Sequence, residues 1–304
     1  MKKRVVFACD IGGSKLLCGL VDEDGNVIDA QKELLSVDTT PDILEQRLVR
    51  LFVLICQRNP AYQPIACGMT IPGLADANSG VWEYACFSGI SDYPIAARME
   101  KQLHLPIMIE NDVNACAVAE RTYGCCRDCG DFLWVTVSNG VGGGLILGGS
   151  LYRGAFGAAG EIGHLIVEED GPVCPCGHRG CLEAMAAGPA ISRRYKALTG
   201  RWESARRIAE LARENDRNAL TVLHQTGEYL GRGLGRAASL LNLRRYVLGG
   251  GVMQSFDLME ADIRKSFQRE AFARPNRNAE ILPTSLHYEA GLLGAAAIAF
   301  SQIT

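Results

Sequence analysis

Short apolar segments, each ending in a polar or glycine-rich turn, recur along the 304 residues of this chain. Continuous apolar runs of this kind are typical of strands buried in a sheet, and an apolar residue every three or four positions is typical of a helix. The predicted strands cover residues 4–9, 16–21, 26–31, 65–70, 106–109, 131–137, 145–147, 246–248 and 280–283. The predicted helices cover residues 41–58, 95–103, 114–120, 204–214, 219–241, 257–270 and 289–300, and residues 80–94 are predicted to be a loop. The pattern favours an α/β fold, and the length suggests two lobes with separate cores.

Two predicted strand pairs are joined by turns of the same kind. The first turn, from Asp10 to Lys15, has the sequence DIGGSK, and the second, from Ser138 to Gly144, has the sequence SNGVGGG. Glycines in such turns expose backbone N–H groups and let a phosphate approach closely. The carboxylate of Asp10 can orient Mg²⁺. A plain glycine-rich hairpin is the alternative for the first turn, but the matched pair favours a site for a polyphosphate.

A carboxylate stands where a predicted strand meets a predicted helix. The strand that ends at Ile109 runs into Glu110, Asn111 and Asp112, and a helix of small residues begins at Asn114. Ligands of α/β proteins bind at the carboxyl ends of strands, and a helix N-terminus helps to keep a carboxylate ionised. Asp112 is therefore a candidate for catalysis, with a simple N-cap as the alternative.

Twelve cysteines are unusual for a chain without the pattern of a secreted disulfide protein. Cys174, Cys176 and Cys181 fall within eight residues that also contain glycines. This spacing predicts a zinc knuckle, and either His164 or His178 can be the fourth ligand of a tetrahedral site. A second cluster, Cys125, Cys126 and Cys129, lacks a convincing fourth ligand and is interpreted as free loop thiols.

Charge and hydropathy exclude several classes of function. The net charge of −3 and the pI of about 6.0 provide no electrostatic footprint for nucleic acid. The apolar run after the basic start ends at Asp10, which is too short for a signal peptide, and no apolar stretch approaches a membrane span. We therefore expect a cytoplasmic protein that contacts neither nucleic acid nor membrane.

The motifs together resemble the ROK family of sugar kinases and repressors, within the actin-like ATPase superfamily, over essentially the whole chain. The cysteine motif after Glu-x-Gly-His is the most specific part of the resemblance. The motifs occupy residues 10–15 (DIGGSK), 71–74 (IPGL), 110–112 (END), 140–144 (GVGGG), 160–164 (GEIGH), 174–183 (CPCGHRGCLE) and 249–251 (GGG). Residues 137–144 and 287–295 look most similar to bacterial N-acetylmannosamine kinases, with glucokinases nearly as similar.

The resemblance implies a fold and an activity. The fold would be a two-lobed actin-like ATPase, built on ribonuclease-H-like cores, with ATP and sugar in the cleft and a small zinc knuckle. The first lobe would comprise residues 1–116 and the C-terminal helix 289–304. The second would comprise residues 117–288 with the zinc-binding loop 164–183. The activity would be ATP-dependent phosphorylation of a sugar hydroxyl, expected to be O6, with Mg²⁺ as the metal. The protein would be a homodimer.

The resemblance also assigns residues, position by position. Asp112 matches the general base. The expected sugar-binding residues are Gly73, Ser88, Asn111, Glu161, His164 and Glu183. The expected nucleotide-binding residues are Asp10, Gly12, Gly13, Ser14, Lys15, Asn139, Gly140, Gly142, Gly249 and Gly250. The expected zinc ligands are His164, Cys174, Cys176 and Cys181, and the resemblance favours His164 over His178.

Some positions depart from the family pattern. Ser14 and Asn139 stand where the phosphate loops usually have Thr. Phe87 stands about where an Asn usually contacts the sugar, so either Ser88 provides that contact or the Phe87 ring packs against an acetamido methyl group. The family's repressors carry an additional N-terminal helix-turn-helix, for which a strand beginning at Arg4 leaves no room. Retention of Asp10 and Asp112 argues against a non-catalytic sugar-binding protein.

Overall fold

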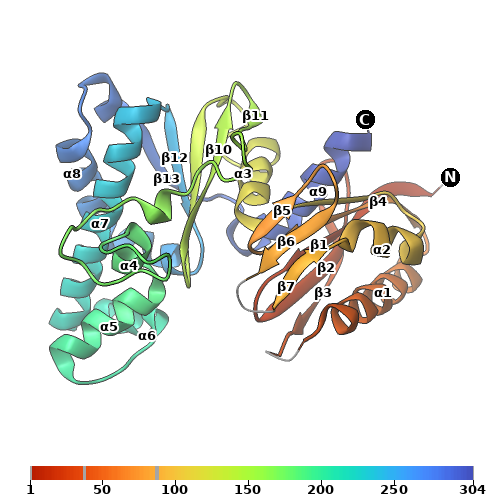
Figure 1. The fold of residues 1–304 in the computed structure, drawn as a ribbon, viewed down its shortest axis with the longest axis horizontal. Helices are drawn as coiled ribbons and strands as arrows, with labels where there is room; N and C mark the ends of the chain where they lie inside the picture. The colour runs from red at the N-terminus through yellow and green to blue at the C-terminus, as the bar shows by residue number, and fades with distance from the viewer. Residues whose placement is uncertain (1, 37–38, 86–88, 304) are drawn as a thin grey trace. The chain divides into compact units, whose positions relative to one another are not determined.

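The computed structural model describes residues 2–36, 39–85 and 89–303. The chain divides into two compact units, each with its own elements (Figure 1). Unit 1 comprises residues 1–128, 154–157 and 288–304, and unit 2 comprises residues 129–153 and 158–287. Mixed sheets and helices alternate in both units, as the α/β prediction requires. A bilayer-spanning helix is absent from the part of the chain that the structure describes.

Unit 1 is built on a sheet with the strand order β3-β2-β1-β4-β8. The strands are β1 (Lys3–Ile11), β2 (Lys15–Val21), β3 (Val27–Leu34), β4 (Tyr62–Ile71) and β8 (Ile107–Asn111). β1, β2 and β3 pair antiparallel, whereas β4 and β8 continue the sheet in parallel with β1. Seven consecutive residues of β1 are buried, which explains its continuous apolar run. The carboxyl ends of β1, β4 and β8 therefore share one edge of the sheet.

Helices cover this sheet and complete the core of unit 1. They are α1 (Pro41–Arg58), α2 (Ile95–Leu103), α3 (Asp112–Thr122) and α9 (Ala290–Ile303), preceded by the 3₁₀ helix η4 (His287–Glu289). In Figure 1, α9 lies against the strands of unit 1. The approach is so close that a Cβ on Gly68 in β4 would come within 1.9 Å of the Ala295 carbonyl oxygen. The C-terminal segment is therefore part of the core that the N-terminal residues begin.

Residues 81–85 and 90–93 form strands where a loop over residues 80–94 was predicted, so that prediction was wrong for these residues. A small antiparallel sheet contains β5 (Leu74–Asp76), β6 (Val81–Ala85) and β7 (Ile90–Tyr93). Trp82 in β6 is buried, and its Nε1–H donates to the Pro72 carbonyl oxygen at 2.9 Å. The apolar residues of these short strands are too few to produce a clear period in the sequence.

Unit 2 repeats the strand plan of unit 1. Its sheet has the order β11-β10-β9-β12-β13, with β9 (Phe132–Val137), β10 (Val141–Leu147), β11 (Ser150–Leu151), β12 (Arg245–Gly249) and β13 (Glu280–Pro283). β9, β10 and β11 pair antiparallel, and β12 and β13 continue in parallel with β9. Gly142 to Gly144, expected in the turn, instead pair with β9 as part of β10. Glycine is required at 143, because a Cβ there would lie 2.4 Å from the Gly160 carbonyl oxygen.

Helices account for most of the remaining residues of unit 2. The α-helices are α4 (Leu182–Ala186), α5 (Gly188–Thr199), α6 (Ala205–Arg213), α7 (Arg217–Leu241) and α8 (Glu260–Glu270). The 3₁₀ helices are η1 (Ile162–His164), η2 (Val252–Leu258) and η3 (Pro275–Asn278). The long helix α7 packs along α8 and touches α4, α5 and α6. The sequence reasoning predicted α6, α7 and α8 but missed α4 and α5.

Candidate functional site

In unit 1, Asp112 is the first residue of α3, but it is not the N-cap. Asn111 takes that role, because its Oδ1 accepts hydrogen bonds from the N–H groups of Val113 at 2.9 Å and Asn114 at 3.0 Å. The interpretation of Asp112 as a simple cap is therefore wrong. Buried Glu110 supports the same turn by accepting from Asn111 N–H at 3.0 Å and from Asn114 Nδ2 at 3.1 Å.

The half-buried carboxyl of Asp112 titrates near neutrality. Burial, and then the negative charge of Asp10, raise the pKa of Asp112 to about 7, although hydrogen bonding from Val113 N–H and the charge of Lys15 oppose the shift. A carboxylate with a pKa near the working pH is well suited to accept a proton from a substrate and release it again.

Asp10 lies at the end of β1 and is buried. Its carboxylate accepts a hydrogen bond from Thr70 Oγ1 at 3.0 Å and pairs with Lys15 Nζ at 3.2 Å. The first turn is closed by a hydrogen bond from Gly12 N–H to the Lys15 carbonyl oxygen at 2.8 Å, which leaves Gly13 and Ser14 exposed. A carboxylate beside an open glycine turn fits the hard oxygen ligands that Mg²⁺ prefers and a phosphate held by backbone N–H groups.

Two of the expected sugar-binding groups in unit 1 are in contact. Asn111 Nδ2 donates to the Gly73 carbonyl oxygen at 2.9 Å. Gly73 has a φ of +88°, and a Cβ there would lie 2.1 Å from the Tyr84 carbonyl oxygen, so only glycine fits. The predicted Ser88, and Phe87 beside it, lie outside the described residues.

In unit 2, one histidine and three cysteines converge. Ligand atoms of His164, Cys174, Cys176 and Cys181 all lie within 4.8 Å of one another. Cys174 Sγ is 3.8 Å from His164 Nδ1, and Cys176 Sγ is 3.6 Å from Cys181 Sγ. This donor set of nitrogen and soft sulfur fits a tetrahedral zinc ion. His178 Nδ1 lies 3.6 Å from Cys176 Sγ but is not part of the mutually close group.

The second ring nitrogen of His164 faces a different neighbour. His164 Nε2 lies 3.9 Å from Glu161 Oε2, while Nδ1 faces Cys174. One ring can therefore bind a metal with one nitrogen and a polar ligand with the other. Glu183, the other expected sugar ligand in this unit, is half-buried in α4.

The second glycine turn is shorter than expected. Ser138 N–H donates to the Gly140 carbonyl oxygen at 2.8 Å, and Asn139 is exposed at the tip. Gly250, beyond the end of β12, has a φ of +92°, and a Cβ there would lie 2.5 Å from the Val137 carbonyl oxygen. The expected nucleotide-binding glycines Gly140 and Gly250 thus adjoin the same end of β9, which brings part of the predicted set together within unit 2.

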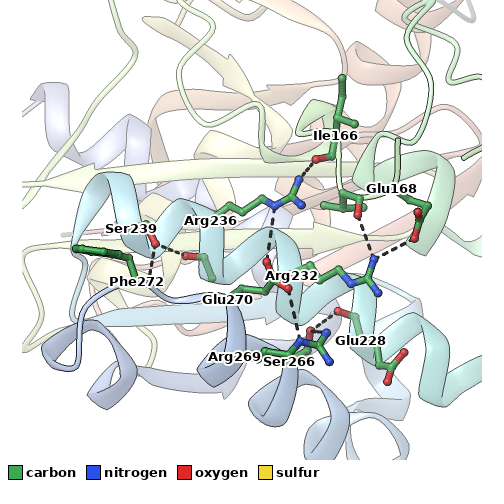
Figure 2. Close-up of polar contacts among 12 residues, drawn as sticks. Ile166, Glu168, Glu228, Arg232, Arg236, Ser239, Ser266, Arg269, Glu270 and Phe272 are labelled. Carbon is green, nitrogen blue, oxygen red and sulfur yellow. Dashed lines mark hydrogen bonds and ion pairs between the residues drawn. The ribbon is translucent and has the colours of Figure 1, made fainter. Parts of the chain in front are cut away.

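Sequence reasoning missed two arginines of α7 that bind residues 166–168 (Figure 2). Arg236 Nη1 donates to the Ile166 carbonyl oxygen, and Arg232 Nη1 donates to the Val167 carbonyl oxygen at 3.3 Å and to Glu168 Oε2 at 3.0 Å. Residues 166–168 begin two positions after His164. The only signal in the sequence is the spacing of four between the arginines, which places both on one face of the helix.

Among the described residues, Cys125, Cys126 and Cys129 do not belong to a group of His, Cys, Asp or Glu side chains close enough together to hold a metal ion. Cys126 and Cys129, which we interpreted as free loop thiols, are buried. Among the cysteines that the structure describes, no disulfide is present.

The comparisons with known proteins lead to one family, whose members include kinases and repressors. Residues 6–302 match the sequence model described as the ROK family. An N-acetylmannosamine kinase from Shigella flexneri is 31% identical over 297 residues, covering 97% of this chain and 98% of that protein. A xylose repressor from Bacillus spizizenii is 30% identical over 292 residues, covering 95% of this chain and 75% of that protein. A crystal structure of a ROK family glucokinase from Streptomyces griseus, in complex with glucose and AMPPNP, is 30% identical with a TM-score of 0.85, covering 98% of this chain and 99% of that one.

Proposed function

This chain belongs to the ROK family, and we propose that it is a sugar kinase that transfers a phosphoryl group from ATP to a hydroxyl, O6 in our proposal, of a hexose or N-acetylhexosamine. The proposal rests mainly on Asp112. Its pKa of about 7 suits a general base, and its carboxylate is not needed as the helix cap because Asn111 takes that role. Similarity to an N-acetylmannosamine kinase and a glucokinase supports N-acetylmannosamine or glucose as the sugar.

The proposed mechanism assigns tasks to residues of both units. Asp112 accepts the hydroxyl proton, while Asn111 and the Gly73 backbone orient the sugar, together with Ser88. Glu161 and Glu183 accept hydrogen bonds from sugar hydroxyls, and His164 contacts the sugar through the ring nitrogen that does not face Cys174. A site built this way strongly rejects analogues that lack the hydroxyl. When bound, ATP supplies the phosphoryl group and Mg²⁺ offsets its charge.

Nucleotide contacts are proposed for the glycine turns of each unit. In unit 1 these are Asp10, Gly12, Gly13, Ser14 and Lys15. In unit 2 they are Asn139 and Gly140 of the turn, Gly142 in β10, Gly249 at the end of β12 and Gly250 beyond it. Asp10 orients Mg²⁺ or its water ligands, and exposed backbone N–H groups of the turns bind phosphate oxygens.

A structural zinc ion at His164, Cys174, Cys176 and Cys181 is part of the proposal. A closed four-ligand site of this type stabilises the loop around it rather than taking part in the reaction. The ligands would fix the positions of Glu161 and Glu183 on either side. We also propose a homodimer, which light scattering of the purified protein would test.

A regulatory sugar-binding protein is the second candidate, because a xylose repressor is nearly as similar to this chain as the kinase is. The test is an ADP-release assay with ATP and Mg²⁺ against glucose, mannose, fructose, allose, N-acetylglucosamine and N-acetylmannosamine. We expect turnover with one or a few of these sugars and its loss, with sugar binding retained, in Asp112→Asn. Sugar binding by calorimetry without any ADP release would favour the regulatory candidate instead.

A further inference from the structure

In unit 2, the carboxylate of Glu183 lies between the cluster of His164, Cys174, Cys176 and Cys181 and the second glycine turn. Glu183 Oε2 accepts a hydrogen bond from Val141 N–H at 3.0 Å, and Val141 is the first residue after Gly140. Its other oxygen, Oε1, lies 3.9 Å from Cys174 Sγ. A single side chain thus contacts the end of the proposed phosphate loop with one atom and a proposed metal ligand with the other.

The turn lies close against this carboxylate. A Cβ on Gly140 would lie 2.5 Å from Glu183 Oε2, so the backbone of the turn packs directly on the carboxylate. The short helix η1 also contacts Val141, because a Cβ on Gly163 would lie 1.9 Å from the Val141 carbonyl oxygen. Val141 is therefore in contact with both Glu183 and the short helix that carries His164.

The other end of the turn is held by the same short segment. Cys181 precedes α4, the Glu183 carbonyl oxygen accepts from Ala187 N–H at 3.1 Å, and Gly188 N–H donates to the Ser138 carbonyl oxygen at 2.7 Å. The segment 181–188 thus begins at Cys181, a proposed metal ligand. Its last residue, Gly188, is hydrogen-bonded to Ser138, the first residue of the turn. Segment 181–188 therefore contacts both ends of the turn from Ser138 to Val141. A metal ion bound at Cys181 would in turn fix the start of this segment.

We infer that Glu183 is a positioning residue for the second phosphate loop, and that metal loading of the cysteine cluster and nucleotide affinity are coupled through it. This inference rests on the proposed kinase function. It adds a task to a residue proposed only for sugar binding. The carboxylate keeps the Val141 N–H and the turn in place, and the metal keeps the segment with the carboxylate in place. Because coupling between two binding sites is reciprocal, bound nucleotide would raise metal affinity by the same factor.

The test measures AMPPNP binding by calorimetry without sugar, in protein whose zinc content has been determined. Glu183→Ala should bind AMPPNP about tenfold more weakly, the size expected for losing a hydrogen bond to a charged acceptor, while keeping its zinc. Glu183→Gln retains an oxygen that can accept from Val141 N–H, so it should bind AMPPNP nearly as well as the wild type. A role of Glu183 in sugar binding alone would leave AMPPNP affinity unchanged in both variants.

Metal removal and the Glu183→Ala substitution, applied singly and together, form a cycle that isolates the coupling between the metal site and AMPPNP affinity. After chelation and resupply of Mg²⁺, the wild type should lose AMPPNP affinity. Glu183→Ala, which already binds AMPPNP more weakly, should show little further loss when its metal is removed. Equal losses in both proteins would overturn the coupling. If the wild type binds no AMPPNP at all, the kinase proposal fails together with this inference. If it binds but Glu183→Ala binds equally well, only this inference fails.

A second variant covers the case in which Glu183→Ala does not fold. Gly140→Ala places a Cβ against Glu183 Oε2 and should weaken AMPPNP binding while leaving the zinc content unchanged. Gly130→Ala is the matched control, because the nearest atom to its Cβ is at 3.4 Å, an ordinary contact. Normal AMPPNP affinity in Gly140→Ala would contradict the positioning role.

Discussion

Replacing Asp112 with Asn is expected to stabilise the ligand-free protein in alkaline solution, although it removes the proposed base. The pKa of Asp112 in the folded protein is about 7, against an ordinary value of 3.8. Because the folded-state pKa is raised, folding is penalised when this carboxyl is ionised. The penalty is absent below pH 3.8, grows as the pH rises toward 7, and is constant above that value. An Asn at this position carries no charge at any pH and escapes the penalty.

The magnitude follows from the shift. The difference of 7 − 3.8 = 3.2 units corresponds to an upper bound of about 4 kcal/mol, since each unit is worth about 1.36 kcal/mol. Asp112 is only half-buried, and solvent screening reduces this to about 1–2 kcal/mol. Each kcal/mol moves the melting temperature of a protein unit of this size by about 2–4 °C.

The assay is differential scanning calorimetry of both proteins at pH 5 and at pH 8.5, without ligands. The advantage of Asp112→Asn should be larger at pH 8.5 than at pH 5. Asp24→Asn is the control, because Asp24 is an exposed turn residue. An advantage that does not grow with pH, or a variant less stable at pH 8.5, would refute the account of Asp112 as a carboxyl whose ionisation opposes folding.

Four further outcomes are expected. The kcat/KM for the sugar should fall below about pH 7 as Asp112 becomes protonated, and a pH profile of ADP release that stays flat to pH 5 would contradict this. His164→Ala should lose bound zinc and His178→Ala should keep about one per chain, as elemental analysis would show; the reverse pattern would make His178 the ligand. Gly68→Ala should lower the urea midpoint by an amount worth about 1–3 kcal/mol, because its Cβ would meet the Ala295 carbonyl at 1.9 Å, whereas Gly130→Ala should change it little. Arg236→Met should speed chelation of zinc, while Arg206→Met, which loses only a surface pair with Glu210, should not; equal rates would show that Arg236 gives the segment no support.

The sequence predicted most of the fold because both sheets rely on continuous apolar strands. Runs such as residues 4–9 and 132–137 leave little choice but a buried strand. The family that the motifs indicated is confirmed by the match over residues 6–302. The small sheet around Trp82 was missed because its strands are short and partly exposed.

The details of the candidate site depend on contacts that are distant in sequence. Asn111 and Asp112 are equally good caps by residue type, and only the backbone conformation decides that Asn111 is the cap. The contacts of Arg236 with Ile166 and of Glu183 with Val141 join residues separated by 70 and 42 positions. The spacing of Arg232 and Arg236 places both on one face of a helix but does not identify their partner, and the contact of Glu183 leaves no signal in the sequence.

The discontinuity of unit 1 has a consequence during protein synthesis. Residues 1–128 leave the ribosome first, but α9, which packs on β1 and β4, belongs to residues 288–304 of the same unit. At ~5–20 residues per second, the 160 positions between residue 128 and residue 288 take about 10–30 s to synthesise. Throughout that interval α9 cannot cover the apolar face around Gly68, so the nascent N-terminal sheet exposes apolar surface of the kind that chaperones protect from aggregation.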